Sequence, residues 1–203
     1  MRIFCVGRNY VEHIQELNNE KPDDPVIFTK PDTALIRNNG PFYLPEFSKD
    51  IHHEVELVLR ICKEGKHIAE EFAGKYFDQV TVGLDFTARD IQQRQKEKGL
   101  PWEPAKAFDG SAPVGDFIPV EKIKDRIDIA FSLKRNGTIV QEGASSHMIF
   151  SFEKIIAYVS KYVTIRKGDF IFTGTPKGVG RIEVGDKLEA FLEGDRLLSV
   201  NVR

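Results

Sequence analysis

Two glutamates, Glu54 and Glu56, stand in residues 51–59, a run whose apolar members alternate and are mostly β-branched or leucine. This pattern predicts a β-strand with both glutamates on one face. Residues two apart on a strand lie roughly 6 to 7 Å apart along its axis, so both side chains can reach one small cation. A half-exposed strand with two solvated glutamates has the same pattern, and it is the commoner case because acidic side chains are mostly exposed.

Two further features could complete a site around this pair. Asp85 ends another strand-like run, in which Gly83 would leave room for a ligand beside it. His13 and Glu16 are three apart in a predicted helix over residues 10–18, so they share a face. A carboxylate beside an imidazole orients the ring and raises its basicity, as a general base needs. From the pair alone, an incidental contact on a surface helix is the commoner explanation.

Residues 174–180 form a glycine-rich loop, Gly-Thr-Pro-Lys-Gly-Val-Gly. It lacks the Gly-Lys-Ser/Thr ending of a phosphate loop and no long helix follows, so nucleotide binding is not favoured. Its backbone amides and the Thr175 hydroxyl could hold a small carboxylate, and a plain connecting loop explains the sequence equally well. Lys30 closes a predicted strand, where it is either a solvated edge residue or an anion ligand.

Length and composition narrow the class of protein. The 203 residues suit one domain spanning residues 1–203, and 29 basic against 31 acidic residues leave no charge excess for nucleic acid or a membrane surface. A small-molecule substrate is therefore expected. Cys5 and Cys62 lie in apolar, strand-like contexts, which indicates buried thiols in a reducing compartment. The apolar run at the amino terminus is too short for a signal peptide, so we expect a cytoplasmic protein.

The scaffold that positions these side chains is predicted to be rich in β-structure. Alternating patterns predict strands at residues 3–6, 26–30, 51–59, 79–85, 127–134 and 139–140, and further strands in the last forty residues. Asn136-Gly137 predicts a hairpin turn. Helices are predicted at residues 10–18 with an Asn9 cap, at residues 87–98 with a Thr87 cap, and after a Ser151 cap. The expected fold class is α+β and β-rich, with a few peripheral helices.

Six short motifs in order resemble the fumarylacetoacetate hydrolase family, and the resemblance covers essentially the whole chain. The motifs are Gly7-Arg8-Asn9-Tyr10-x-x-His13, Lys30-Pro31, His53-Glu54-Val55-Glu56-Leu57, Gly83-x-Asp85-x-Thr87-Ala88-Arg89-Asp90, Ala105-Lys106-x-Phe108-Asp109 and Thr173-Gly174-Thr175-Pro176-x-Gly178-Val179-Gly180. The chain is most similar to the short, single-domain acylpyruvases and oxaloacetate decarboxylases. This resemblance implies a mixed β-sandwich roll, a homodimer, and Mg²⁺ or Mn²⁺ bound by a Glu-x-Glu pair and a distant Asp.

The resemblance also implies roles for individual residues. It assigns the metal ligands to Glu54, Glu56 and Asp85, and three carboxylates without sulfur do favour a hard cation. His13 and Glu16 would activate water, and Lys106 would lie beside the reacting part of the substrate. The residues expected to line the substrate pocket are Arg8, Lys30, Arg89, Gln92 and Thr175. Larger members of the family have another acidic ligand upstream, for which this chain has no clear counterpart.

The expected activity is metal-dependent cleavage of a carbon–carbon bond in an acylpyruvate such as fumarylpyruvate or acetylpyruvate, through a stabilised pyruvate enolate. The His13–Glu16 pair favours this hydrolysis, because decarboxylation needs no base. An oxaloacetate decarboxylase or tautomerase is the nearest alternative, followed by a hydratase or isomerase of 2-oxo-enoic acids. A β-rich binding module without catalysis would leave the three carboxylates unexplained.

Overall fold

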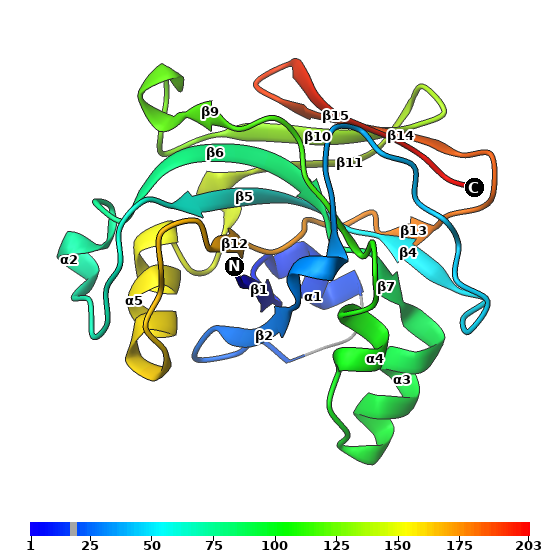
Figure 1. The fold of residues 1–203 in the computed structure, drawn as a ribbon, viewed down its shortest axis with the longest axis horizontal. Coiled ribbons are helices and arrows are strands. Elements are labelled where there is room, and N and C mark those ends of the chain that lie inside the picture. Colours follow the sequence, from blue (N-terminus) through cyan, green and yellow to red (C-terminus); the bar gives the residue numbers. More distant parts are fainter. Residues whose placement is uncertain (17–19) are drawn as a thin grey trace.

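The computed structural model of the chain describes residues 1–16 and 20–203 (Figure 1). Its largest sheet is mixed, because β1 runs parallel to β12 and the other neighbours run antiparallel. In spatial order its strands are β2 (Val26–Lys30), β1 (Ile3–Gly7), β12 (Phe170–Phe172), β5 (Val55–Ile61), β6 (Phe77–Leu84) and β9 (Ile118–Pro119). The central strands are buried almost throughout, as expected of a sheet covered on both faces.

A second, antiparallel sheet packs on β5 and β6 and closes a β-sandwich. Its strands, in spatial order, are β11 (Thr138–Ala144), β10 (Ala130–Arg135), β14 (Lys187–Leu192) and β15 (Asp195–Asn201). Leu57 and Val82 of the first sheet share one fully buried apolar cluster with Leu133 and Ala190 of the second. The predicted α+β, β-rich fold class is confirmed.

Two small sheets and the helices complete the fold. β13 (Gly180–Arg181), β4 (Ile51–His53) and β7 (Thr87–Ala88) form one small sheet, and β3 (Leu35–Ile36) pairs with β8 (Ala112–Pro113). The helices are α1 (Val11–Glu16), α2 (Glu70–Ala73), α3 (Arg89–Lys98), α4 (Glu103–Lys106) and α5 (Phe152–Tyr162), with 3-10 turns η1 (Asp32–Ala34), η2 (Val120–Lys122) and η3 (Ser145–His147). α3 and α4 lie together beside β4 and β7 (Figure 1). Within the described ranges, no helix has the length and apolar character to cross a membrane.

Local sequence signals place several element ends correctly. Asn136 and Gly137 both have positive φ, 53° and 85°, and form the tight turn between β10 and β11 that was predicted. Gly99 ends α3 in the left-handed conformation, with φ 62°. The Ser151 hydroxyl accepts a hydrogen bond from the Lys154 amide at 3.2 Å and caps α5, as predicted. The predicted end of the first helix, at residues 17–18, lies outside the described residues.

The predicted strand over residues 51–59 is wrong in one respect, because the run breaks at Glu54. β4 pairs with β7 and β13, whereas β5 pairs with β6 and β12. The two halves therefore belong to different sheets, and Glu54 lies at the corner between them.

Candidate active site

The break at Glu54 gathers the three predicted metal ligands. The register of β5 on β6 pairs Val55 with Leu84, and the Asp85 amide donates to the Glu54 carbonyl at 2.8 Å. Glu54, Glu56 and Asp85 are all buried, and each offers a carboxylate oxygen within 4.8 Å of the others. Oxygens on opposite sides of one hard divalent cation lie about 4 to 5 Å apart, so this cluster fits such an ion.

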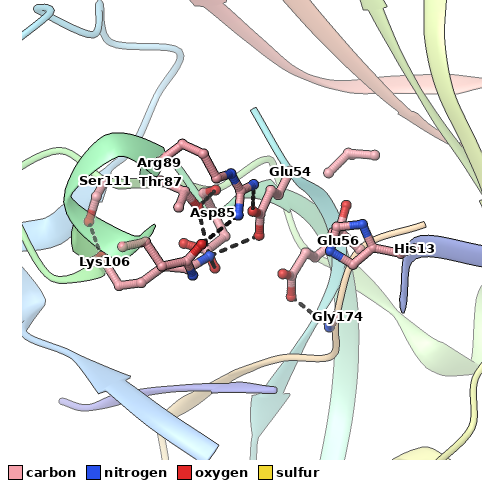
Figure 2. A network of polar contacts seen from close by, with 12 residues as sticks. His13, Glu54, Glu56, Asp85, Thr87, Arg89, Lys106, Ser111 and Gly174 are labelled. Carbon is pink, nitrogen blue, oxygen red and sulfur yellow. Dashed lines mark hydrogen bonds and ion pairs between the residues drawn. The ribbon is translucent and has the colours of Figure 1, made fainter. Parts of the chain in front are cut away.

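Two buried lysines, Lys30 and Lys106, contact the carboxylates, and Figure 2 shows Lys106 beside Glu54 and Asp85. Lys106 Nζ donates to Glu54 Oε2 at 2.9 Å, to Asp85 Oδ2 at 2.7 Å and to Thr87 Oγ1 at 2.6 Å. Burial works to lower the pKa of Lys106, but the charges of Asp85 and Glu54 outweigh it and raise that pKa to about 12. Lys30 Nζ forms an ion pair with Asp85 Oδ1 at 2.7 Å from the opposite side. The Lys106 ammonium group therefore carries charge.

Glu54 and Glu56 differ in the charged groups that surround them. Burial works to raise the pKa of Glu54, but the cations of Lys106 and Arg89 hold it far below its usual range. Burial and the charge of Asp85 raise the pKa of Glu56, opposed by a hydrogen bond from the Gly174 amide at 2.7 Å. Within residues 1–16 and 20–203, no side-chain ion pair reaches Glu56. This uncompensated carboxyl is what a bound divalent cation would neutralise, so the donor set fits a metal.

The predicted dyad is present on α1. His13 Nδ1 lies 3.2 Å from Glu16 Oε2, and because a carboxylate only accepts, Nδ1 is the donor in this contact. Glu16 Oε1 accepts a second hydrogen bond from the Gly178 amide at 3.0 Å. His13 is buried and lines the same cavity as the three carboxylates. In a neutral His13 ring, this contact would leave Nε2 as the acceptor, the arrangement that a general base requires.

Asn9 does not cap α1, contrary to the prediction. Its buried amide donates to the Thr173 carbonyl at 2.7 Å and to the Phe150 carbonyl at 3.1 Å, and accepts from the Phe150 amide at 2.7 Å. Gly174 makes room for this contact, since a Cβ there would lie 2.6 Å from Asn9 Cβ, and its φ is +104°. Asn9 therefore ties the start of the His13 helix to the end of β12.

Thr87 does not cap α3 either. The residue before α3 is Ala88, which makes no side-chain cap, and Thr87 instead accepts the hydrogen bond from Lys106. Arg89 opens the helix and donates to Glu54 Oε1 at 2.5 Å and to Gln92 Oε1 at 2.6 Å. α3 is thereby a helix whose first turn faces the carboxylate cluster.

These side chains surround a cavity of about 500 Å³, including its open mouth. It is lined by Val6, Gly7, Arg8, His13, Phe28, Glu54, Glu56, Asp85, Arg89, Gln92, Lys96, Trp102, Lys106 and Thr175. Of the residues predicted for the site, Lys30 and Glu16 are not in the lining. Lys30 lies behind Asp85, and Glu16 lies behind His13. The remaining predicted residues are gathered here, and their individual roles stay predictions.

Three cations give one part of this cavity a positive charge. Burial and then the charges of Arg8 and Arg89 lower the pKa of Lys96, which places the three groups near one another. Arg8 is half-buried and has a φ of +61°, a conformation that a non-glycine residue adopts at a cost of about 1–3 kcal/mol. The arrangement suits an anionic ligand.

Two aromatic lining residues were not predicted. Phe28 and Trp102 meet edge to face, with ring centroids 5.8 Å apart. Phe28 precedes Lys30 by two on β2, so it shares a face with a predicted site residue, and this signal could have found it. Gly83, by contrast, leaves no room for a ligand: a Cβ there would lie 2.8 Å from Phe172 and Val58 side-chain atoms, so its role is core packing.

Residues 2–202 match the family described as fumarylacetoacetate (FAA) hydrolase C-terminal, and the chain belongs to that family. Oxaloacetate tautomerase FAHD1, mitochondrial, from Mus musculus is 47% identical over 95% of this chain and 87% of the mouse protein. Oxaloacetate tautomerase YcgM from Escherichia coli strain K12 is 41% identical over 97% of this chain and 90% of its own length. The solved structure of fumarylpyruvate hydrolase from Pseudomonas aeruginosa in complex with Mn²⁺ and pyruvate has a TM-score of 0.94 at 36% identity, covering 100% of this chain and 89% of that one. These relatives are enzymes, and the family resemblance of the motifs is confirmed.

Proposed function

We propose that this chain is a metal-dependent enzyme that interconverts the keto and enol forms of oxaloacetate. The observation that carries the proposal is the buried Glu54–Glu56–Asp85 cluster with the His13 imidazole in the same cavity. Two relatives that match nearly the whole chain are named oxaloacetate tautomerases, which supports the choice of substrate. This substrate replaces the acylpyruvate expected from the sequence as the leading candidate.

The reaction needs a proton to leave C3 and another to reach the oxygen at C2. A Mg²⁺ or Mn²⁺ ion held by the three carboxylates would polarise the 2-oxo group and lower the free energy of the enolate. His13 Nε2 takes the C3 proton, and Glu16 holds the resulting imidazolium in place. The imidazolium then returns the proton to the C2 oxygen, so no proton is consumed.

Charged groups of the chain bind the rest of the substrate. Oxaloacetate carries two carboxylates, and the positive part of the cavity offers Arg8, Arg89 and Lys96 to receive one of them. The Thr175 hydroxyl and the Lys106 ammonium lie near the carboxylate cluster and can stabilise the oxygens of the reacting end.

Hydrolysis of an acylpyruvate is the second candidate, and the His13–Glu16 pair favours it. His13 would take a proton from water, and the hydroxide would add to the distal carbonyl carbon. Breaking the bond between C3 and that carbon leaves a carboxylic acid and a pyruvate enolate, which takes up a proton. The relative from Pseudomonas aeruginosa is a fumarylpyruvate hydrolase, which supports testing this reaction on the same site.

The decisive experiment compares three reactions with Mn²⁺ and with a chelator: ketonisation of enol-oxaloacetate, pyruvate release from oxaloacetate, and pyruvate release from fumarylpyruvate. We expect ketonisation to be the fastest and to depend on the metal, after subtraction of the rate with Mn²⁺ alone. His13→Ala should lower it by about 10²- to 10⁴-fold. The matched control is His147→Ala, an exposed histidine outside the site cavity, which should leave the rate unchanged. Full activity in chelator or in His13→Ala would contradict the proposal.

A further inference from the structure

Gln141 is a buried side chain that joins the metal side of the cavity to the glycine-rich loop. It stands on β11 of the second sheet and has an exposed fraction of 2%. Its Oε1 accepts from the Val55 amide at 3.0 Å and lies 2.9 Å from His53 Nδ1. Its Nε2 donates to the Pro176 carbonyl at 3.0 Å and to Thr175 Oγ1 at 2.9 Å. No part of Gln141 lines the cavity itself.

The backbone partners fix which way the Gln141 amide faces. The Val55 amide can only donate, so the atom beside it is the oxygen. The Pro176 carbonyl can only accept, so the atom beside it is the nitrogen. A flipped amide would place two donors together at one end and two acceptors at the other, which buried groups do not tolerate.

This orientation decides the direction of the Thr175 hydroxyl. One N–H of the Gln141 amide is used by the Pro176 carbonyl, and the other points at Thr175 Oγ1, so that oxygen is an acceptor here. In the described part of the chain the Thr175 hydroxyl donates to no other group, so its proton is left for a partner in the cavity that it lines. A hydroxyl in this state donates and selects a ligand oxygen with a lone pair.

We propose that Gln141 is a positioning residue that makes Thr175 a dedicated donor to an anionic oxygen of the substrate. This inference rests on the proposed function, because a 2-oxo acid supplies such an oxygen. The loop is held firmly enough for the purpose, since Gly178, with φ +94°, packs directly against the Val140 carbonyl beside Gln141. Through Val55, the same amide also holds the backbone between the two glutamate ligands.

The test replaces the amide nitrogen of Gln141, which donates to Thr175, by a carboxylate oxygen, which only accepts. In Gln141→Glu the introduced carboxylate accepts the Thr175 proton and turns it away from the cavity. Pyruvate is the probe, and its dissociation constant is measured by calorimetry at saturating Mn²⁺. We expect it to rise at least about 10-fold, as for loss of one hydrogen bond to a charged group. Thr175→Val should give a similar rise, and the double variant no more than about 2-fold beyond either single one.

Two controls separate positioning from damage to the fold. Gln79→Glu adds the same charge at a half-buried glutamine outside the cavity and should leave pyruvate affinity within about 2-fold. Gln141→Met removes both polar ends without adding charge, frees the Thr175 hydroxyl to rotate, and should give a smaller rise than Gln141→Glu. Mn²⁺ affinity and thermal stability are measured for every variant.

Several results would overturn the inference. They are unchanged pyruvate affinity in folded Gln141→Glu, fully additive effects with Thr175→Val, or a loss that disappears once Mn²⁺ binding is restored. Pyruvate binding without any oxaloacetate turnover would contradict the proposed function alone and leave this inference standing. A wild-type protein that ketonises enol-oxaloacetate but does not bind pyruvate at saturating Mn²⁺ would overturn this inference alone.

Discussion

Replacement of Lys30 by methionine tests whether the carboxylate cluster is held together by buried charge. Lys30 is fully buried, and its Nζ pairs with Asp85 Oδ1 at 2.7 Å. The same nitrogen donates to Ser111 Oγ at 2.9 Å, to the Ser111 carbonyl at 3.0 Å and to the Lys106 carbonyl. Methionine keeps most of the side-chain length and removes the charge and every one of these donors.

The size of the effect follows from the burial of both partners. Removal of one member of a buried ion pair costs about 3–5 kcal/mol, because the other charge stays buried without compensation. In a chain of this length each kcal/mol lowers Tm by about 2–4 °C, so the metal-free variant should melt about 6–20 °C below the wild type. A divalent cation held by the carboxylate cluster would supply positive charge to Asp85. At saturating Mn²⁺ the loss should fall to about 1–3 kcal/mol, the cost of the remaining unsatisfied acceptors.

The assay is urea unfolding with chelator and with saturating Mn²⁺. The matched control is Lys187→Met, which removes an exposed lysine paired with Glu189 at 2.9 Å and should cost less than about 1 kcal/mol in either condition. A loss for Lys30→Met no larger than that of the control in chelator would refute the account. So would an equal loss with and without Mn²⁺, because the argument requires the metal to replace part of the missing charge.

Three further predictions concern single residues. Tyr10→Phe should abolish part of the stability loss above about pH 10. Burial and then the charge of Glu56 raise the pKa of Tyr10, so the stability that this residue contributes below its unfolded pKa is lost as the pH rises. Urea unfolding of the variant and the wild type across this pH range measures the difference. Asn9→Ala should lower the free energy of unfolding by about 1–3 kcal/mol, because the hydrogen bonds that hold the start of the His13 helix are lost. It should also lower kcat for ketonisation more than it changes KM, and equal changes in kcat and KM would contradict this. Glu56→Gln should weaken Mn²⁺ binding measured by calorimetry by at least about 10-fold, and unchanged affinity would remove Glu56 from the ligand set.

Where neighbouring residues alone determine the backbone conformation, the sequence was sufficient to predict the local structure. The turn at Asn136-Gly137, the Ser151 cap and the Gly99 stop depend on conformations that these residue types prefer locally. The break at Glu54 could not be predicted this way. Whether an alternating run continues in one sheet or changes partners depends on strands distant in sequence, here β7 and β13 against β6 and β12.

The two wrong caps have the same physical cause. Asn9 and Thr87 have side chains suited to capping, and capping needs only a free backbone amide nearby. In the folded chain each finds a buried partner from far along the sequence instead, Asn9 at Phe150 and Thr173, and Thr87 at Lys106. A buried polar group left without a partner costs more than an exposed helix end, so the distant contact decides.

The residues of the candidate site could be named from type, spacing and family resemblance, but their energetics could not. The opposite pKa shifts of Glu54 and Glu56 arise because Arg89 and Lys106 form ion pairs with Glu54, whereas burial and the charge of Asp85 dominate at Glu56. Gln141 belongs to no motif, and its place is defined only by three-dimensional contacts with Val55 and the loop after β12.

The glycine-rich loop joins these parts, although its sequence alone was compatible with a plain connection. The Gly174 amide donates to the Glu56 carboxylate, and the Gly178 amide donates to Glu16, which contacts His13. Between them, Thr175 lines the cavity and accepts a hydrogen bond from Gln141 Nε2. One backbone segment thus contacts Glu56 and Glu16 and carries Thr175, so it fixes the positions of the residues proposed for the metal, the base and the substrate. A displacement of this loop would disturb all three together, whereas a change on α3 would act through Arg89 on Glu54 and on the cationic part of the cavity.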